Sequence, residues 1–525
     1  MIRVNMGLKG VDHGMRWCGG VLLVLASLLA HMPVAAGDIE SEVQQIIAGA
    51  ALARTQVSVH LLDLRTGRSL IEINADQPMV PASTMKLLTT AAALTRLGPD
   101  FKFSTTLELL PAEADAAAST AGPRRGGSGP SAPLPSLLIR GSGDPAFGDP
   151  ALLASAGLYL DDLMDLWVQA VVDTGQKRFA ELWLDDRVFD QQFVHPDWPV
   201  SQLHRFSYSE VAGINFYENL MAVLPVPLEP GQAPQVQTEP WFPQLNTTNR
   251  ATTGRVDDFD IQRPLNTNRF MFFGSVRNRR SEPFRVTVHD PPVFFADFFR
   301  YRLQQAGISV ARIDRVDPRD RIGQGSTEVL HQINTTLAGV IDRTNRDSQN
   351  LFAEALLKRM GHELTGAPGS FENGASAVRL FLRDRMADHI GLSGVRVADG
   401  SGLSPKNQLT TRVISTLLQV MQQDETLGPI YSASLAYAGH SGTLRDRMRG
   451  LRSSVYAKSG FLGASANYAS SLAGYIVRPD GRSYAFAMIF NGFRPPISNQ
   501  QIRDLQDRLI EAIDRDLAGS GESRR

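Results

Sequence analysis

The chain has 525 residues, of which 43% are hydrophobic and 20% are charged, so its length suits roughly two to four globular domains. This composition excludes wholesale disorder. The formal net charge of −1 excludes the broad basic surface of a nucleic-acid-binding protein, and we expect no nucleic acid among its partners.

Residues 1–36 have the three parts of a secretory signal peptide. Basic residues precede an apolar run over residues 19–30, and Val34-Ala35-Ala36 provides the small side chains that precede a cleavage site. The alternative is an uncleaved membrane anchor, but the run is shorter than the ~20 residues that a spanning helix needs. We therefore expect a periplasmic protein with no transmembrane segment after cleavage. Cys18, the only cysteine, leaves with the signal, which excludes disulfides and thiolate metal sites.

The first part of the mature chain predicts a β-hairpin followed by a helix. Residues 56–74 contain two partly alternating apolar runs on either side of the turn Arg65-Thr66-Gly67-Arg68. A helix is predicted from Pro81 to Gly98. Residues 111–135 are rich in alanine, glycine, serine and proline, and we expect them to form a flexible surface segment.

The rest of the chain predicts an insertion within a divided α+β domain. Short strand-like runs interrupted by proline, asparagine and glycine indicate a mainly-β insertion at residues 106–325. Helical periodicity follows up to residue 420, and two strands and an amphipathic helix end the fold. The early hairpin and the late strands would form one domain from both ends of the chain. We expect its two parts at residues 38–105 and 326–516, and a disordered tail at residues 517–525.

The first candidate catalytic motif is Ser83-Thr84-Met85-Lys86, at the start of the predicted helix. The three-residue spacing places Ser83 and Lys86 on one helix face. A neutral lysine there can take the serine proton, provided that burial or a second cation lowers its pKa. Backbone N–H groups at the helix start would favour a developing oxyanion. A polar surface pair is the alternative explanation for so short a motif.

Two further motifs contain residues that suit the same chemistry. Ser348-Gln349-Asn350 precedes an apolar helix, so Ser348 could relay a proton and Asn350 could hold a substrate carbonyl. A helix N-cap is the alternative. Lys458-Ser459-Gly460 ends a strand-like run, where Lys458 would supply positive charge and Gly460 would allow close backbone approach. A strand-end turn with a solvated lysine is the alternative.

Together, in this order, the three motifs match the set found in class A β-lactamases and penicillin-binding proteins. The chain resembles the low-molecular-mass class C penicillin-binding proteins, which are D-alanyl-D-alanine carboxypeptidase/endopeptidases of peptidase family S13. The resemblance covers most of the mature chain, including the long insertion between the first two motifs. It extends to four further segments, to which we assign turn and packing roles: residues 141–145, 399–404, 442–448 and 471–475.

The resemblance implies a fold and a mechanism. The fold would be a five-stranded antiparallel sheet flanked by helices, with inserted mainly-β domains. Ser83 would attack a D-alanyl-D-alanine bond or a D-amino-acid cross-link of peptidoglycan and form an acyl-enzyme, with Lys86 as its base. Ser348 would pass a proton to the departing amine, and Asn350 would orient the substrate. β-Lactam antibiotics would acylate the same serine, and no metal or cofactor is implied.

The resemblance assigns substrate recognition to the third motif, where the sequence departs from the family pattern. Lys458 and Ser459 would recognise the substrate carboxylate, and the N–H groups of Ser83 and Phe461 would form the oxyanion hole. The family usually has threonine or serine after Lys-Thr-Gly, so Phe461 removes a hydroxyl and puts carboxylate recognition in doubt. The other departure is Gln349, where aspartate is common.

Two alternatives to a D,D-peptidase remain open. A β-lactamase or esterase would use the same residues but would release hydrolysed antibiotic quickly. A peptidoglycan-binding protein with a decayed catalytic site is favoured only by Phe461. The ten histidines show no ligand spacing, so no metal site is predicted.

Overall fold

The computed structural model describes residues 39–112, residues 133–463 apart from positions 318, 321, 324 and 326, and residues 468–522. The expected signal peptide, and all but the first two and last three residues of the expected flexible segment 111–135, lie outside these ranges. Within them, no helix combines the length and the apolarity that crossing a bilayer requires.

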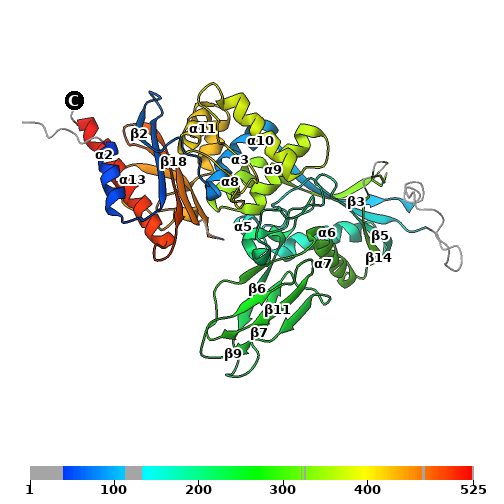
Figure 1. Ribbon diagram of the computed structural model, residues 1–525. Coiled ribbons are helices and arrows are strands. Elements are labelled where there is room, and N and C mark those ends of the chain that lie inside the picture. The colour runs from blue at the N-terminus through cyan, green and yellow to red at the C-terminus, as the bar shows by residue number, and fades with distance from the viewer. Residues whose placement is uncertain are drawn as a thin grey trace, which may run out of the picture.

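A six-stranded antiparallel sheet in the order β16-β17-β18-β19-β1-β2 lies at the centre of the main domain (Figure 1). Both ends of the chain contribute to it, as the sequence predicted. The five-stranded sheet that we expected is present, and the additional strand, β16, has only two residues. The strands are β1 (Gln56–Asp63), β2 (Ser69–Ile73), β16 (Ala436–Tyr437), β17 (Ser454–Leu462), β18 (Tyr468–Val477) and β19 (Ser483–Phe493).

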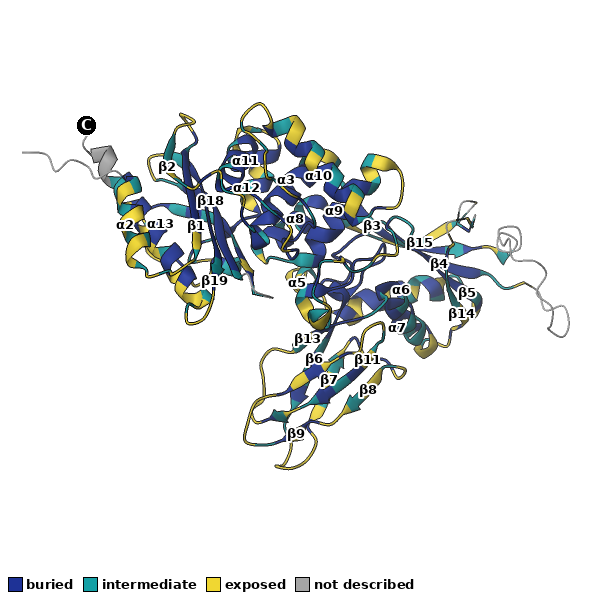
Figure 2. Ribbon diagram, in the orientation of Figure 1, coloured by how far each residue is buried: buried dark blue, intermediate teal, exposed yellow. Residues whose placement is uncertain are grey.

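Helices cover both faces of this sheet (Figure 1). On one face lie α2 (Ile39–Gly49) and α13 (Asn499–Glu522). On the other lie α3 (Met85–Leu97), α8 (Leu337–Arg346), α9 (Asn350–Thr365), α10 (Phe371–Met386), α11 (Thr411–Gln423) and α12 (Leu427–Ala433). Covering both faces explains why β18 and β19 are nearly continuous apolar runs and not alternating ones, and both are buried along most of their length (Figure 2).

The insertion begins with a second sheet in the order β14-β5-β4-β3-β15, on which two helices pack. Strands β3 and β15 pair with each other, so the chain enters and leaves the insertion side by side. The expected domain boundaries fall within β3 and just before β15. The elements are β3 (Lys102–Leu110), β4 (Ser136–Gly141), α5 (Pro150–Ser155), α6 (Leu160–Asp173), β5 (Arg178–Asp185), α7 (Pro291–Gln305), β14 (Ser309–Arg315) and β15 (Glu328–Thr336).

Three small sheets form the rest of the insertion and extend away from the main domain (Figure 1). Their orders are β13-β6-β7, β10-β11-β8 and β12-β9. The mainly-β prediction is confirmed, with helices α5 to α7 in addition. The strands are β6 (Leu220–Val226), β7 (Gln235–Glu239), β8 (Asn246–Asn249), β9 (Thr252–Thr253), β10 (Asp260–Gln262), β11 (Arg269–Phe273), β12 (Ser275–Val276) and β13 (Phe284–Thr287).

The C-terminal end differs from the sequence prediction. Helix α13 continues to Glu522, past residue 517, where we expected a disordered tail to begin. Leu517 is buried in the apolar cluster between α13 and the sheet, and this burial favours continuation of the helix.

Candidate active site

Ser83 lies in the short 3-10 helix η1 (Ala82–Thr84), directly before α3. Ala82 has a φ of 48°, a left-handed conformation that turns the chain sharply in front of Ser83. Because Ser83 and Lys86 are three residues apart, their side chains share one face, and Nζ of Lys86 lies 3.0 Å from Oγ of Ser83. The predicted serine–lysine pair is therefore in contact.

The ammonium of Lys86 is completely buried behind Ser83. Its Nζ donates to Oδ1 of Asn350 at 2.6 Å and to the carbonyl of Ser401 at 2.9 Å. Burial lowers the pKa of Lys86 to about 7, although the negative charges of Glu354 and Asp399 oppose this shift. A substantial fraction of Lys86 is therefore neutral near pH 7 and able to accept a proton.

The second motif faces the third across the same site. Nζ of Lys458 donates to Oγ of Ser348 at 2.8 Å. Ser348 has a φ of 63°, and the N-cap of α9 is Gln349, whose side chain makes no capping hydrogen bond. The side chains of Ser348 and Asn350 therefore face the two lysines and do not cap the helix. Burial, and then repulsion from Lys86, hold the pKa of Lys458 well below its usual range.

The end of β17 presents an open edge beside Ser83. The N–H of Ala438, directly after β16, donates to the carbonyl of Val455, and no described strand pairs on that side with the second half of β17. Backbone groups of alternate residues point to the same side of a strand, so those of Ser459 and Phe461 point to this open edge. An extended peptide could add there as a further strand.

Gly460 allows β17 to lie against Ser83. A Cβ at this position would stand 2.8 Å from the backbone nitrogen of Ser83 and 2.2 Å from Oγ of Ser471. The hydroxyl of Ser471 is fixed by a 2.6 Å hydrogen bond to the carbonyl of Pro81. Only glycine therefore permits the close approach of the two backbones from which the oxyanion hole would be built.

The structure places all eight predicted residues at one site, and six of them line a cleft of about 490 Å³. A neighbouring groove of about 1000 Å³ shares part of its wall and continues over the insertion, along β10 and β13. The cleft is lined by Ser83, Ser348, Asn350, Ser459, Gly460 and Phe461, while Lys86 and Lys458 lie buried behind it.

The segment at residues 399–404, to which we assigned only turn and packing roles, contacts Lys86. The carbonyl of Ser401 accepts from Nζ of Lys86, as described above. Gly402 lies so close to η1 that a Cβ at this position would stand 1.9 Å from the carbonyl oxygen of Ala82. The carboxylate of Glu354, one turn after Asn350 on α9, accepts the N–H groups of Gly400 and Ser401. The contact of Glu354 with Ser401 was not predicted from the sequence, because no short motif contains both residues. The only signal in the sequence is the helical spacing that places Glu354 one turn after Asn350.

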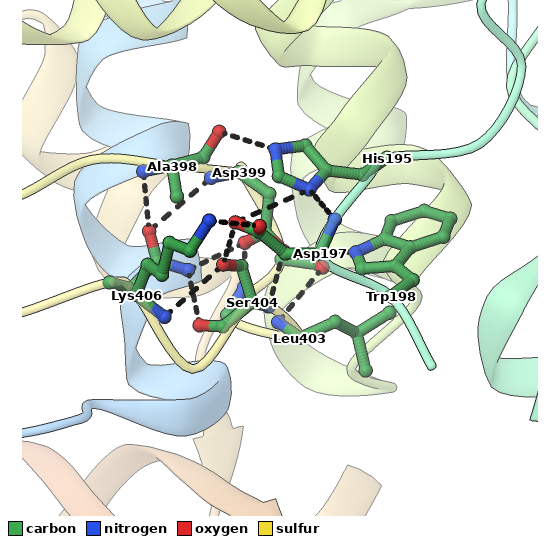
Figure 3. A network of polar contacts seen from close by, with 12 residues as sticks. His195, Asp197, Trp198, Ala398, Asp399, Leu403, Ser404 and Lys406 are labelled. Carbon is green, nitrogen blue, oxygen red and sulfur yellow. Dashed lines mark hydrogen bonds and ion pairs between the residues drawn. The ribbon is translucent and has the colours of Figure 1, made fainter. Parts of the chain in front are cut away.

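Asp399 fixes the shape of this segment (Figure 3). Its carboxylate accepts from the N–H groups of Gly402 and Ser404 and from the side chains of Trp198 and Asn407. Trp198 belongs to the insertion, so the insertion helps to hold the loop whose carbonyl contacts Lys86.

Comparison with known proteins decides the family. The sequence model of the D-Ala-D-Ala carboxypeptidase 3 (S13) family matches residues 39–515. The chain belongs to this family. As the resemblance predicted, this S13 member is a serine-type hydrolase.

Relatives of this S13 member are similar over most of their length. A D-alanyl-D-alanine carboxypeptidase of Actinomadura sp. (strain R39) is 28% identical over 477 residues, which cover 87% of this chain and 82% of the relative. The D-alanyl-D-alanine carboxypeptidase DacB of Haemophilus influenzae is 24% identical over 446 residues, which cover 82% of this chain and 84% of the relative. The crystal structure of penicillin binding protein 4 from H. influenzae has the same fold, with a TM-score of 0.70 at 21% identity over 90% of this chain and 99% of that one.

The two departures from the S13 pattern have different surroundings. The Phe461 ring is 47% exposed at the cleft and stacks on Tyr468. Gln349 donates from Nε2 to the buried carboxylate of Glu218 at 2.7 Å. Glu218 lies in the 3-10 helix η4 (Tyr217–Asn219) of the insertion and also pairs with Arg285 and Arg343. The middle residue of the second motif, which we had regarded as less tied to the chemistry, therefore joins this motif to the insertion.

Proposed function

We propose that this protein is a periplasmic D-alanyl-D-alanine carboxypeptidase/endopeptidase that hydrolyses peptidoglycan peptides through an acyl-enzyme on Ser83. The observation that carries the proposal is the contact of Ser83 with a buried lysine whose pKa is lowered to about 7, in a cleft beside an open strand edge. The signal-like residues 1–36 support export.

Acylation begins when neutral Lys86 takes the proton of Ser83 and the serine oxygen attacks the substrate carbonyl. The N–H groups of Ser83 and Phe461 stabilise the oxyanion that forms. Ser348, in contact with Lys458, passes a proton to the departing amine as the C–N bond breaks. The proton that Lys86 took from Ser83 replaces it, which leaves Lys86 neutral again. Asn350, which accepts from Lys86, orients the substrate beside the serine.

Deacylation returns the enzyme to its starting state. A water molecule attacks the ester carbonyl and gives a proton to Lys86, and Lys86 returns this proton to Oγ of Ser83 as the ester bond breaks. A β-lactam ring contains the same reactive carbonyl, so it acylates Ser83. Its leaving amine stays tethered to the acyl group and hinders the approach of water, so this adduct is expected to last.

Intact-mass spectrometry with benzylpenicillin tests the proposal. A stable adduct with one molecule of the drug is expected on the mature protein and not on a Ser83→Ala variant. If the drug is consumed and no adduct accumulates, the protein is a β-lactamase-like enzyme. If the drug stays intact and no adduct forms, the site is decayed and the proposed activity is wrong.

A further inference from the structure

The cleft has a positively charged wall beyond Ser459. Three arginines line it, Arg285 from β13, Arg447 after the 3-10 helix η5 (Gly442–Leu444) and Arg503 from α13. The charge of an arginine is available to a substrate only where no carboxylate of the protein already neutralises it.

Two of these arginines are already paired. Arg447 is 6% exposed, and its Nη2 lies 2.6 Å from Oδ1 of Asp507 and donates to Gln506 as well. Arg285 donates from Nη1 to Glu218 at 2.9 Å. Their remaining function at the cleft wall is structural, because breaking either pair would leave a carboxylate that is largely buried without its partner.

Arg503 is different. Among the residues that the structure describes, its guanidinium has no hydrogen-bond or ion-pair partner, although it is partly buried at the cleft. Asn499, one turn earlier on α13, also lines the cleft, and its buried Oδ1 has no partner either. Unpaired polar groups on one helix face at a cleft wall are typical of a site that a ligand completes.

Helix α13 packs beside the end of β17, where Arg503 lines the cleft. Nε2 of Gln506 donates to Oγ of Ser470 at 3.3 Å, and Ser470 pairs directly with Phe461 across the sheet. The Arg447 guanidinium also donates to the backbone carbonyl of Arg503. This turn of α13 is therefore held beside the end of β17, where the third motif presents its polar side chains.

The hydroxyls alone make a weak anion site. Oγ of Ser459 donates to Oγ1 of Thr443 at 2.8 Å, so the two hydroxyls partly satisfy each other. Phe461 contributes no hydroxyl. A guanidinium binds a carboxylate through two parallel charge-assisted hydrogen bonds, which are about twice as strong as neutral ones.

We propose that Arg503 binds the terminal carboxylate of the substrate, together with the hydroxyls of Ser459 and Thr443, and that it replaces the hydroxyl absent at Phe461. This assignment rests on the proposed hydrolysis of peptides ending in D-alanine. It makes Arg503 the residue that distinguishes a free C-terminal carboxylate from an internal or blocked peptide.

Binding to the Ser83→Ala variant tests the assignment without turnover. The probes are an acylated peptide ending in D-alanyl-D-alanine and the same peptide with a C-terminal amide, measured by calorimetry. Adding Arg503→Ala is expected to weaken binding of the free acid about 10- to 100-fold and to leave binding of the amide unchanged. Arg503→Lys should retain part of the preference. Arg508→Ala, on an exposed position of the same helix, is the matched control.

The assignment is wrong if Arg503→Ala binds the acid as tightly as its parent, or if it loses acid and amide equally. The second result would indicate that Arg503 only shapes the cleft. Failure of the proposed function is recognised separately. If benzylpenicillin does not acylate Ser83 but binding of the acid still depends on Arg503, the carboxylate site stands and the proposed hydrolase activity is wrong.

Discussion

Glu354 acts on Lys86 through the backbone of one residue that lies between them. Its carboxylate accepts the N–H of Ser401 at 2.8 Å, and the carbonyl of Ser401 accepts from Nζ of Lys86 at 2.9 Å. Glu354 therefore positions the hydrogen-bond acceptor that holds Lys86 next to Ser83, without touching Lys86 itself.

Acylation of Ser83 is expected to accelerate as the pH rises through neutrality. Burial lowers the pKa of Lys86 to about 7, and only the neutral amine can accept the serine proton. The rate constant for acylation by benzylpenicillin should rise about tenfold per pH unit below this pKa and level off about one unit above it. Lys86→Arg should abolish acylation because arginine stays protonated. A flat profile between pH 5 and 8 would exclude Lys86 as the titrating base.

Glu354→Gln is expected to change how stability depends on pH. Burial, reinforced by the charge of Asp399, raises the pKa of Glu354 to about 8. A pKa raised by folding contributes stability below the unfolded value, near 4.5, and this contribution is lost as the pH rises toward 8. The fall in melting temperature between pH 5 and 8 should therefore be smaller in the variant than in the parent. The control is Glu363→Gln, at an exposed site on the same helix. Its melting temperature should fall between pH 5 and 8 as much as that of the parent.

Gly460→Ala is expected to disable the oxyanion hole. The new methyl group would meet the Ser83 nitrogen and the Ser471 hydroxyl, so β17 must move away from η1. We expect acylation to slow by about 100- to 1000-fold and stability to fall by about 1–3 kcal/mol. Gly391→Ala, where a Cβ meets nothing within 4 Å, is the control. Normal acylation of Gly460→Ala would show that the two backbones need not approach so closely.

Gln349→Asp is expected to be harmful, although aspartate is common at this position in the family. The new carboxylate would stand close to the buried Glu218, which now accepts from Gln349 at 2.7 Å. Loss of this hydrogen bond and like-charge repulsion should cost about 1–3 kcal/mol of unfolding free energy. Acylation should also slow, because Ser348 holds its left-handed conformation next to this contact. Thermal unfolding and acylation rates measure both effects. Parental values for both would show that the hydrogen bond from Gln349 to the insertion affects neither stability nor acylation.

Local patterns predicted much of the fold and the chemical groups of the site. The hairpin at residues 56–74, the helix after Ser83 and the late strands follow from alternation, turn residues and helical periodicity, which depend only on neighbours in the chain. The order of the three short motifs predicted the reactive serine and its lysine, because each motif requires a few residues on one turn or strand.

Three properties of the site depended on tertiary structure. The pKa of Lys86 is lowered by burial, which the sequence around it does not encode. The Ser401 carbonyl, held by Glu354, contacts Lys86 from a segment hundreds of residues away, and Arg503 lines the cleft from the last described helix. No periodicity relates such positions. They come together only when the sheet and the helices on its two faces pack, and this packing also removes the water that would otherwise screen their charges.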